Sequence, residues 1–147
     1  MKILIAAVNK CKNKAYKAIF DEYVKRNFAK INLKEIEVKD CGNKKQLEGE
    51  KLLSECQGYK IVALDSGGAL LSSKDLAKKI TNYQNLSISK IAFVIGGDEG
   101  LSDEVKQKAD FILSFGKITL PHMMARIVLI EQLYRAFCIN KGHPYHK

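Results

Sequence analysis

The chain has 147 residues, 46% hydrophobic and 28% charged, with a net charge of +9. This length and composition predict a single folded domain over residues 1–147 and exclude a disordered chain, and no apolar run reaches the roughly 18 residues of a transmembrane helix. We therefore expect a cytoplasmic protein that does not enter the membrane, and the positive charge favours a polyanionic partner such as nucleic acid, although lysine also serves solubility.

The first half of the chain alternates between strand and helix patterns. Residues 2–8 form a short apolar run typical of a strand, and residues 14–28 show helical spacing behind a candidate N-cap at Asn13. Residues 31–40 alternate like a strand with one polar face. Residues 43–58 are expected to form an exposed helix.

The second half repeats the alternation with more apolar strands. Residues 60–65 predict a buried strand that ends in a turn at residues 66–68. Ser72 or Ser73 is expected to cap a helix that runs through Tyr83. The last four expected elements are the strand at 90–97, a short helix capped by Ser102, the strand at 110–116 and a long helix at 123–140.

This order predicts an α/β fold in which helices cover a parallel sheet. Ligands of such sheets bind outside the carboxyl ends of the strands. Three loops are expected at that edge, namely residues 64–68, 96–101 and 116–122, and they are the candidate site.

The loop Ile95–Gly100, with the sequence IGGDEG, favours a ligand that carries positive charge. It matches neither GxGxxG nor a phosphate-binding loop, and Asp98 and Glu99 would repel a phosphate. S-adenosylmethionine, with its sulfonium and ammonium groups, suits such a loop. The alternative is a tight turn with a solvated acidic tip.

The final helix is apolar around most of its circumference, which predicts burial on two sides. The sheet would cover one side and a second copy of the chain the other, so we expect a homodimer. Arg126, Glu131 and Arg135 are the polar exceptions. Glu131 and Arg135 stand at i, i+4, which fits either an ion pair within the helix or an arginine that contacts RNA.

The tail after this helix contains His143, Tyr145 and His146, a combination that could grip an unstacked RNA base or be incidental. With only His122 elsewhere, the histidines make a poor metal site, and we expect no metal. The four scattered cysteines are expected to be reduced thiols.

Several motifs together resemble one known family. They are Leu64-Asp65, IGGxEG at 95–100, ITLPH at 118–122, EQLYRA at 131–136 and HPYH at 143–146. In this order and over essentially the whole chain, they are similar to the RlmH family of SPOUT-class methyltransferases.

The resemblance implies a parallel-sheet SPOUT fold with a C-terminal trefoil knot, an obligate homodimer and S-adenosylmethionine as cofactor. It also implies methylation of N3 of a pseudouridine in large-subunit (23S) ribosomal RNA within the assembled ribosome. Rival hypotheses are a non-catalytic RNA- or ribosome-binding protein and a nucleotide- or flavin-binding protein.

Carried over by motif, the resemblance also implies site residues. The cofactor-binding candidates are Leu64, Gly96, Gly97, Gly116, Lys117, Ile118, Thr119, Leu120 and Pro121. The catalytic candidates follow separately, as a hypothesis about mechanism. They are Arg135, which would orient the base or stabilise its anion, and His143, Tyr145 and His146, any of which could serve as general base. The tail is expected to reach across to the partner's cofactor.

Overall fold

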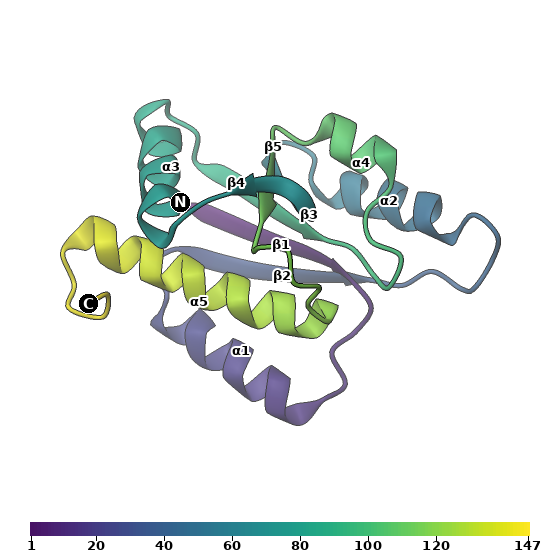
Figure 1. The fold of residues 1–147 in the computed structure, drawn as a ribbon, viewed down its shortest axis with the longest axis horizontal. Helices are drawn as coiled ribbons and strands as arrows, with labels where there is room; N and C mark the ends of the chain where they lie inside the picture. Colours follow the sequence, from purple (N-terminus) through teal and green to yellow (C-terminus); the bar gives the residue numbers. More distant parts are fainter.

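A computed structural model describes all residues, 1–147, as a five-stranded parallel sheet covered by helices on both faces (Figure 1). The strand order is β2-β1-β4-β3-β5. The strands are β1 (Lys2–Val8), β2 (Lys30–Ile36), β3 (Lys60–Leu70), β4 (Lys90–Ile95) and β5 (Phe111–Ser114). The helices are α1 (Lys14–Arg26), α2 (Lys44–Glu55), α3 (Ser73–Asn85), α4 (Asp103–Lys108) and α5 (His122–Lys141). The predicted α/β fold is confirmed.

The central strand β1 shows why the sheet is buried on both faces. Ile3, Ile5 and Ala7 point into one hydrophobic core, and the alternate residues Leu4, Ala6 and Val8 point into a second core on the opposite face. Successive side chains of a strand point to opposite faces, so an unbroken apolar run requires a cover on each.

The helices form two layers. Helices α1, α3 and α5 cover one face, with α5 lying between the other two, and α2 and α4 cover the opposite face (Figure 1). The expectation of an exposed α2 is wrong in part, because Leu52, Gly49 and even the carboxylate residue Glu48 are buried against the sheet side. Most positions of this helix carry polar or charged residues, so its narrow packing face could not be recognised in the sequence.

The predicted turn at residues 66–68 is wrong. The strand β3 continues to Leu70, and its pairing with β5 shifts register between Leu64 and Ala69, both of which align with Leu113. Gly68 permits this bulge, because a Cβ there would lie 2.6 Å from the carbonyl oxygen of Ile112. The bulged residues are thereby displaced from the ladder at the carboxyl edge of the sheet.

The predicted helix starts are confirmed. The side chains of Asn13, Ser72 and Ser102 each accept hydrogen bonds from backbone N–H groups in the first turn of α1, α3 and α4. At its other end α5 stops at Gly142, which takes the left-handed conformation with φ 68° and turns the chain back. None of the helices combines the length and the apolarity that a membrane crossing requires.

Candidate functional site

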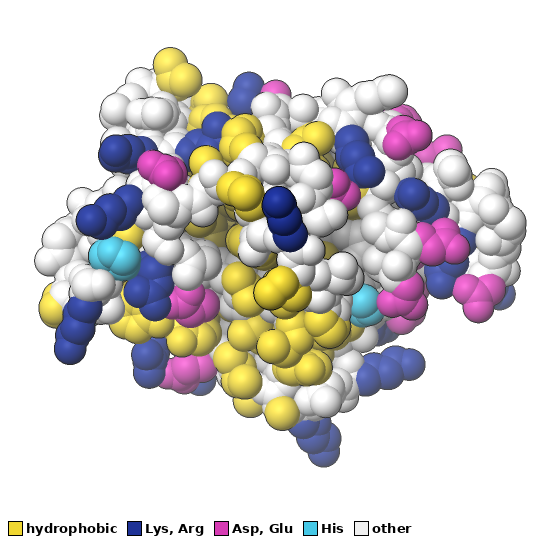
Figure 2. Space-filling model, in the orientation of Figure 1, with side chains coloured by type: hydrophobic (Ala, Val, Ile, Leu, Met, Phe, Trp, Pro, Cys, Tyr) yellow, Lys and Arg dark blue, Asp and Glu magenta, His cyan; other side chains and the backbone are white.

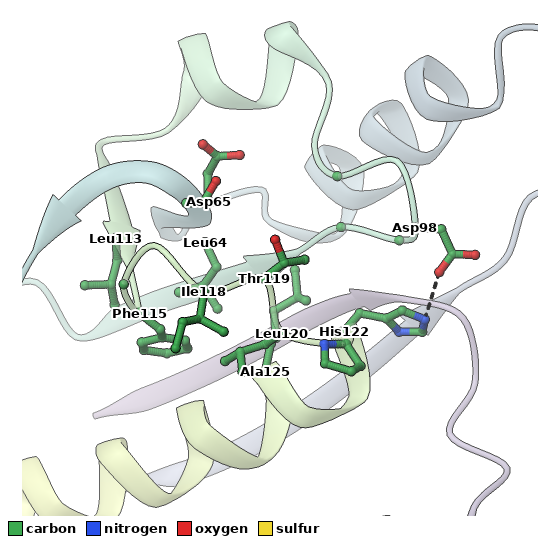
Figure 3. Close-up of a pocket in the computed structure, with 17 residues that line it drawn as sticks. Leu64, Asp65, Asp98, Leu113, Phe115, Ile118, Thr119, Leu120, His122 and Ala125 are labelled. Atoms are coloured by element: carbon green, nitrogen blue, oxygen red, sulfur yellow. Dashed lines mark ion pairs between the residues drawn. The ribbon is translucent and has the colours of Figure 1, made fainter.

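A cavity of about 580 Å³ opens at the carboxyl edge of β3, β4 and β5, beside the first turn of α5. This volume lies within the range of small-molecule and cofactor sites. Its walls come from the three segments that the sequence placed at this edge, which are the irregular part of β3 from Leu64 onward and the loops after β4 and β5. Figure 3 shows Leu64, Leu113, Phe115 and Ile118 on one side of the cavity and His122 with Asp98 on the other.

The structure brings most of the cofactor-binding candidates to this cavity. Leu64, Gly96, Gly97, Gly116 and the run from Ile118 to Pro121 line it. Lys117 is exposed and does not line it. The arrangement supports the cofactor assignment, and direct contact by each residue stays a prediction.

Gly96 sits where two stretches of backbone meet. A Cβ added there would lie 2.5 Å from the carbonyl carbon of Gly100 and 2.9 Å from the backbone nitrogen of Leu101. Gly97 and Gly100 also form an isolated antiparallel bridge, and the Gly100 N–H donates to the Gly97 carbonyl at 3.0 Å. The loop after β4 is therefore a tight backbone structure that tolerates no side chain at its first position.

The charge around the cavity is acidic. Asp65 and Asp98 are among the lining residues, and no lysine or arginine is. The Nε2 atom of His122 lies 3.4 Å from Oδ1 of Asp98 (Figure 3). The Nζ atom of Lys106 lies 3.6 Å from Oδ1 of Asp65. Such a lining disfavours a phosphate and is compatible with a cationic ligand.

A buried carboxyl group lies against the loop after β4, on the side of helix α2. Glu48 of α2 is 4% exposed, and one of its carboxylate oxygens lies 3.2 Å from where a Cβ on Gly97 would stand. Burial raises the pKa of Glu48, opposed by Lys44 and reinforced by Glu99 and Asp98. The underside of this loop is thus a place where negative charge is unfavourable.

The sequence did not single out Leu113, Phe115 or Ala125 as lining residues, yet all three line the cavity. The first two belong to β5 and its end, and Ala125 faces the cavity from α5. Their signal was position alone, because each lies within three residues of the loop at 116–122 that was already expected at the edge. In the sequence alone, an apolar side chain in a strand or helix cannot be distinguished from a residue of the hydrophobic core.

The four catalytic candidates gather at the other end of α5, around Glu131. This carboxylate accepts hydrogen bonds from Arg135 Nε at 3.0 Å, from Arg135 Nη2 at 2.6 Å and from the Tyr145 hydroxyl at 2.9 Å. Nδ1 of His146 lies 3.4 Å from Nη1 of Arg135, and Nδ1 of His143 accepts the Tyr145 N–H at 3.2 Å. The ion pair predicted within the helix is confirmed, and the tail folds back onto it.

Tyr145 is held as a neutral phenol. Burial raises its pKa, and hydrogen bonds with Tyr23 and Glu131 and the nearby negative charge of Glu131 raise it further. The two hydroxyls of Tyr145 and Tyr23 are 3.3 Å apart, and the Tyr145 ring packs 4.6 Å from that of Tyr134. A tyrosine in this setting donates a hydrogen bond and is a poor general base.

Within one chain the cavity and the tail cluster are far apart. The cavity adjoins His122 at the start of α5, and Arg135 lies on the same straight helix, a rise of about 20 Å further on. The structure therefore brings the cofactor candidates together and the catalytic candidates together, but in two separate places.

The sequence and fold comparisons agree with this architecture. Residues 1–146 match a family model described as predicted SPOUT methyltransferase. Proteins named ribosomal RNA large subunit methyltransferase H from Shouchella clausii and Lactobacillus helveticus are 43% and 42% identical, each aligned over 100% of both chains.

Solved structures show the same fold at low sequence identity. A probable methylase family protein from Haemophilus influenzae is 15% identical with a TM-score of 0.61, covering 99% of this chain and 70% of its own. A tRNA (m1G37) methyltransferase from Aquifex aeolicus is 15% identical with a TM-score of 0.56, covering 92% of this chain and 70% of its own. The chain therefore belongs to the SPOUT methyltransferase family, and within it to the group of the ribosomal RNA large subunit methyltransferase H proteins.

Proposed function

We propose that this protein methylates N3 of a pseudouridine in large-subunit (23S) ribosomal RNA, acting as a homodimer on the assembled ribosome. The observation that carries the proposal is the end-to-end identity of about 42% with proteins named ribosomal RNA large subunit methyltransferase H. The net charge of +9 suits a polyanionic substrate.

S-adenosylmethionine is the methyl donor, and when bound it supplies an electrophilic methyl group on a sulfonium. The residues present fit this group. The cavity has apolar walls from Leu64, Leu113 and Phe115, carboxylates at Asp65 and Asp98, and no lysine or arginine. Backbone of the loops at 96–97 and 116–121 would hold the adenosyl part, together with the side chains of Ile118 and Leu120 that line the cavity.

The nucleophile is a ring nitrogen that must lose its proton, so the chain has to orient the base and remove or stabilise charge. Arg135 offers a guanidinium whose Nη1 faces His146, and its pKa is raised by the hydrogen bond to Glu131. We assign Arg135 to the developing anion of the base and His146 or His143 to the proton. Tyr145 then acts as a hydrogen-bond donor that orders the tail.

A second copy of the chain would bring the two halves of the site together. Hydrophobic side chains gather at the centre of the face in Figure 2, over the first half of α5 and the loop before it. Ile118 is 80% exposed there and Met124 is 36% exposed. Pairing of two copies through this face would cover these side chains and is our basis for the homodimer. The trefoil knot stays a prediction of the SPOUT resemblance.

The decisive experiment is transfer of a radiolabelled methyl group to ribosomes from a strain that lacks this modification. We expect label in the large-subunit RNA, at a single pseudouridine, and weaker or no labelling of the same RNA stripped of protein. Binding of S-adenosylmethionine without transfer to either substrate would instead support a non-catalytic ribosome-binding protein. Binding of a nucleotide or flavin alone would overturn the proposal.

Mixed dimers test whether the site is shared. One chain carries Gly96→Ala, which damages the cavity, and the other carries Arg135→Ala, which damages the tail cluster. Because half of randomly paired dimers are mixed and each holds one intact shared site, activity should return to about a quarter of the wild-type value. No recovery would show that each chain uses its own tail.

A further inference from the structure

The loop between β1 and α1, residues 9–13, is held in place by hydrogen bonds to Arg126 and Glu35. Arg126 of α5, only 2% exposed, donates from Nη2 to the carbonyl of Val8 at 2.9 Å and also to the carbonyl of Asn9. Its Nη1 donates to Oε2 of Glu35 at 2.6 Å. The same Glu35 oxygen accepts the N–H of Cys11 at 2.7 Å.

The clamp holds the loop although one of its buried polar atoms is left unsatisfied. The Nε atom of Arg126 is buried without a hydrogen-bond partner, which is an unfavourable arrangement. Asn9 adopts φ 70°, a left-handed conformation that asparagine tolerates better than most residues, and its N–H donates to the Ile36 carbonyl at 2.8 Å. Arg126 thus fixes a loop on another element and forms no part of the cavity.

The clamped loop presents lysines to solvent. Lys10, Lys12 and Lys14 are exposed and belong to none of the ion pairs of the structure. The helix that begins at Lys14 has no acidic residue in its first turn. Lys and Arg side chains project at the lower right of Figure 2, where this loop and the start of α1 lie. Three uncompensated cations therefore surround the positive end of a helix.

The loop lies beside the cofactor cavity. Val8, the last residue of β1, places its Cγ1 atom 3.0 Å from the position of a Cβ on Gly97, which lines the cavity. On the other side of the first turns of α5, Met123 and Arg126 line a small second cavity of about 80 Å³ together with Cys11. One turn of α5 thus separates the basic loop from the cavity that holds His122 and Ala125.

We propose that Lys10, Lys12 and Lys14, fixed by the Arg126–Glu35 clamp, form the surface that receives the phosphate backbone of the RNA strand next to the target nucleotide. This inference rests on the proposed function and names the part of the chain that contacts the substrate. Lysine binds phosphate as a point charge without reading sequence, so the surface positions the strand and leaves the choice of base to the site. Rigidity of the loop keeps the ordering cost low when RNA binds.

The chain offers a matched control at the opposite edge of the sheet. Lys2, Lys30 and Lys90 are exposed, lie side by side in the register of β1, β2 and β4, and stand at the amino ends of these strands, away from the cavity. Substituting either set of three by glutamine removes the same charge. A third variant, with arginine at positions 10, 12 and 14, keeps the charge.

The experiment measures binding of ribosomes to each variant from 50 to 200 mM salt, with S-adenosylmethionine affinity measured separately by calorimetry. For the Lys10, Lys12 and Lys14 glutamine variant we expect the slope of log affinity against log salt to shrink by about 3, since each lost phosphate contact removes about 1. The control triple should keep the wild-type slope, the arginine variant should bind as wild type does, and cofactor affinity should be unchanged in all three.

Two results would overturn the inference. One is an equal loss of slope in both glutamine variants, which would mean that only net charge matters. The other is a wild-type slope in the variant at positions 10, 12 and 14. In either case methyl transfer by the wild-type protein would leave the proposed function standing. If instead the wild-type protein transfers no methyl group to ribosomes, the proposed function itself fails.

Discussion

The two ends of α5 are built on opposite plans. At its first turn, α5 adjoins a roomy cavity, and the contact with a charged group that the helix makes there joins His122 to Asp98. At its last turns, side chains of Glu131, Arg135 and Tyr145 lock together by hydrogen bonds. The first turn of α5 thus adjoins a cavity with few reactive side chains. The cluster around Glu131 contains polar and charged side chains that contact one another.

This difference indicates how a small protein can assign cofactor binding to one end of a helix and the chemistry on the target base to the other end. Backbone walls suit a cofactor that must be held in one shape, because backbone atoms do not depend on side-chain rotamers, and packed apolar side chains complete the cavity. A charged cluster suits the reacting base, where charge develops and must be met by fixed groups. Since the two ends lie about 20 Å apart along one helix, the division is useful only if a second copy supplies the missing half.

The largest effect is expected at the tail end. Arg135→Ala should lower single-turnover methyl transfer to ribosomes by about 100-fold or more, because it removes the cation that we propose stabilises the anion of the reacting base. Affinity for S-adenosylmethionine should stay at the wild-type value, since the cavity is at the other end. Lys141→Ala removes a charge from the same helix as a control and should be near neutral. A matched loss of cofactor binding in Arg135→Ala would erase the contrast between the ends.

The next effect is at the cavity end. Gly96→Ala places a Cβ 2.5 Å from the Gly100 carbonyl carbon, so the loop must shift. We expect cofactor affinity measured by calorimetry to fall by about 10-fold or more, and the unfolding free energy to fall by about 1–3 kcal/mol. Gly42→Ala, where an added Cβ meets no atom within 4 Å, is the matched control. Unchanged cofactor binding in Gly96→Ala would show that this loop is not the cofactor site.

A smaller effect on cofactor affinity is expected at Asp98, and it should exceed the effect at its neighbour Glu99. Asp98→Asn removes a carboxylate that lines the cavity, and its partner Glu99 does not line it. Because Asp98 is 86% exposed, the loss of attraction for a cationic cofactor should be only about 2- to 5-fold in affinity. Glu99→Gln should change affinity less. Equal effects would point to long-range charge rather than contact.

The smallest effect concerns stability under the loop. The raised pKa of Glu48 means that its contribution is fully present below the unfolded pKa, about 4.3, and is lost as pH rises through the higher folded pKa. Glu48→Gln lacks this loss, so its melting temperature should gain on the wild type as pH rises from 4 to 8. Glu50→Gln, on an exposed position of the same helix, should run parallel to the wild type. A constant gap between Glu48→Gln and the wild type would contradict the assignment.

The architecture could be predicted because its signals are local. Apolar runs such as Ile3–Val8 and caps such as Ser72 and Ser102 depend on neighbouring residues alone, and the rule for the carboxyl edge then placed the cavity. The bulge after Leu64 could not be predicted, because Ser-Gly-Gly serves a turn and a bulge equally well. Only the position of Ile112 on the neighbouring strand decides between them.

The clamp was hidden for a different reason. Arg126 on an apolar helix reads as an exposed exception, and Glu35 reads as the polar face of an edge strand. They are 91 positions apart in sequence, and nothing in either segment announces the other. The tail was flagged by its histidines and tyrosine, yet its hydrogen bonds to Glu131 depend on the left-handed turn at Gly142.

The position of α5 in the larger core affects when the protein can fold during its synthesis. Five of the core residues on that face, Leu129, Ile130, Leu133, Ala136 and Phe137, come from this last helix. During synthesis the chain emerges from its amino end, so β1 leaves the ribosome long before the helix that covers it. The apolar face of β1, β4 and β3 therefore stays uncovered until α5 has been synthesised. A chain truncated within α5 would leave this face exposed, so it should aggregate rather than fold into a smaller enzyme.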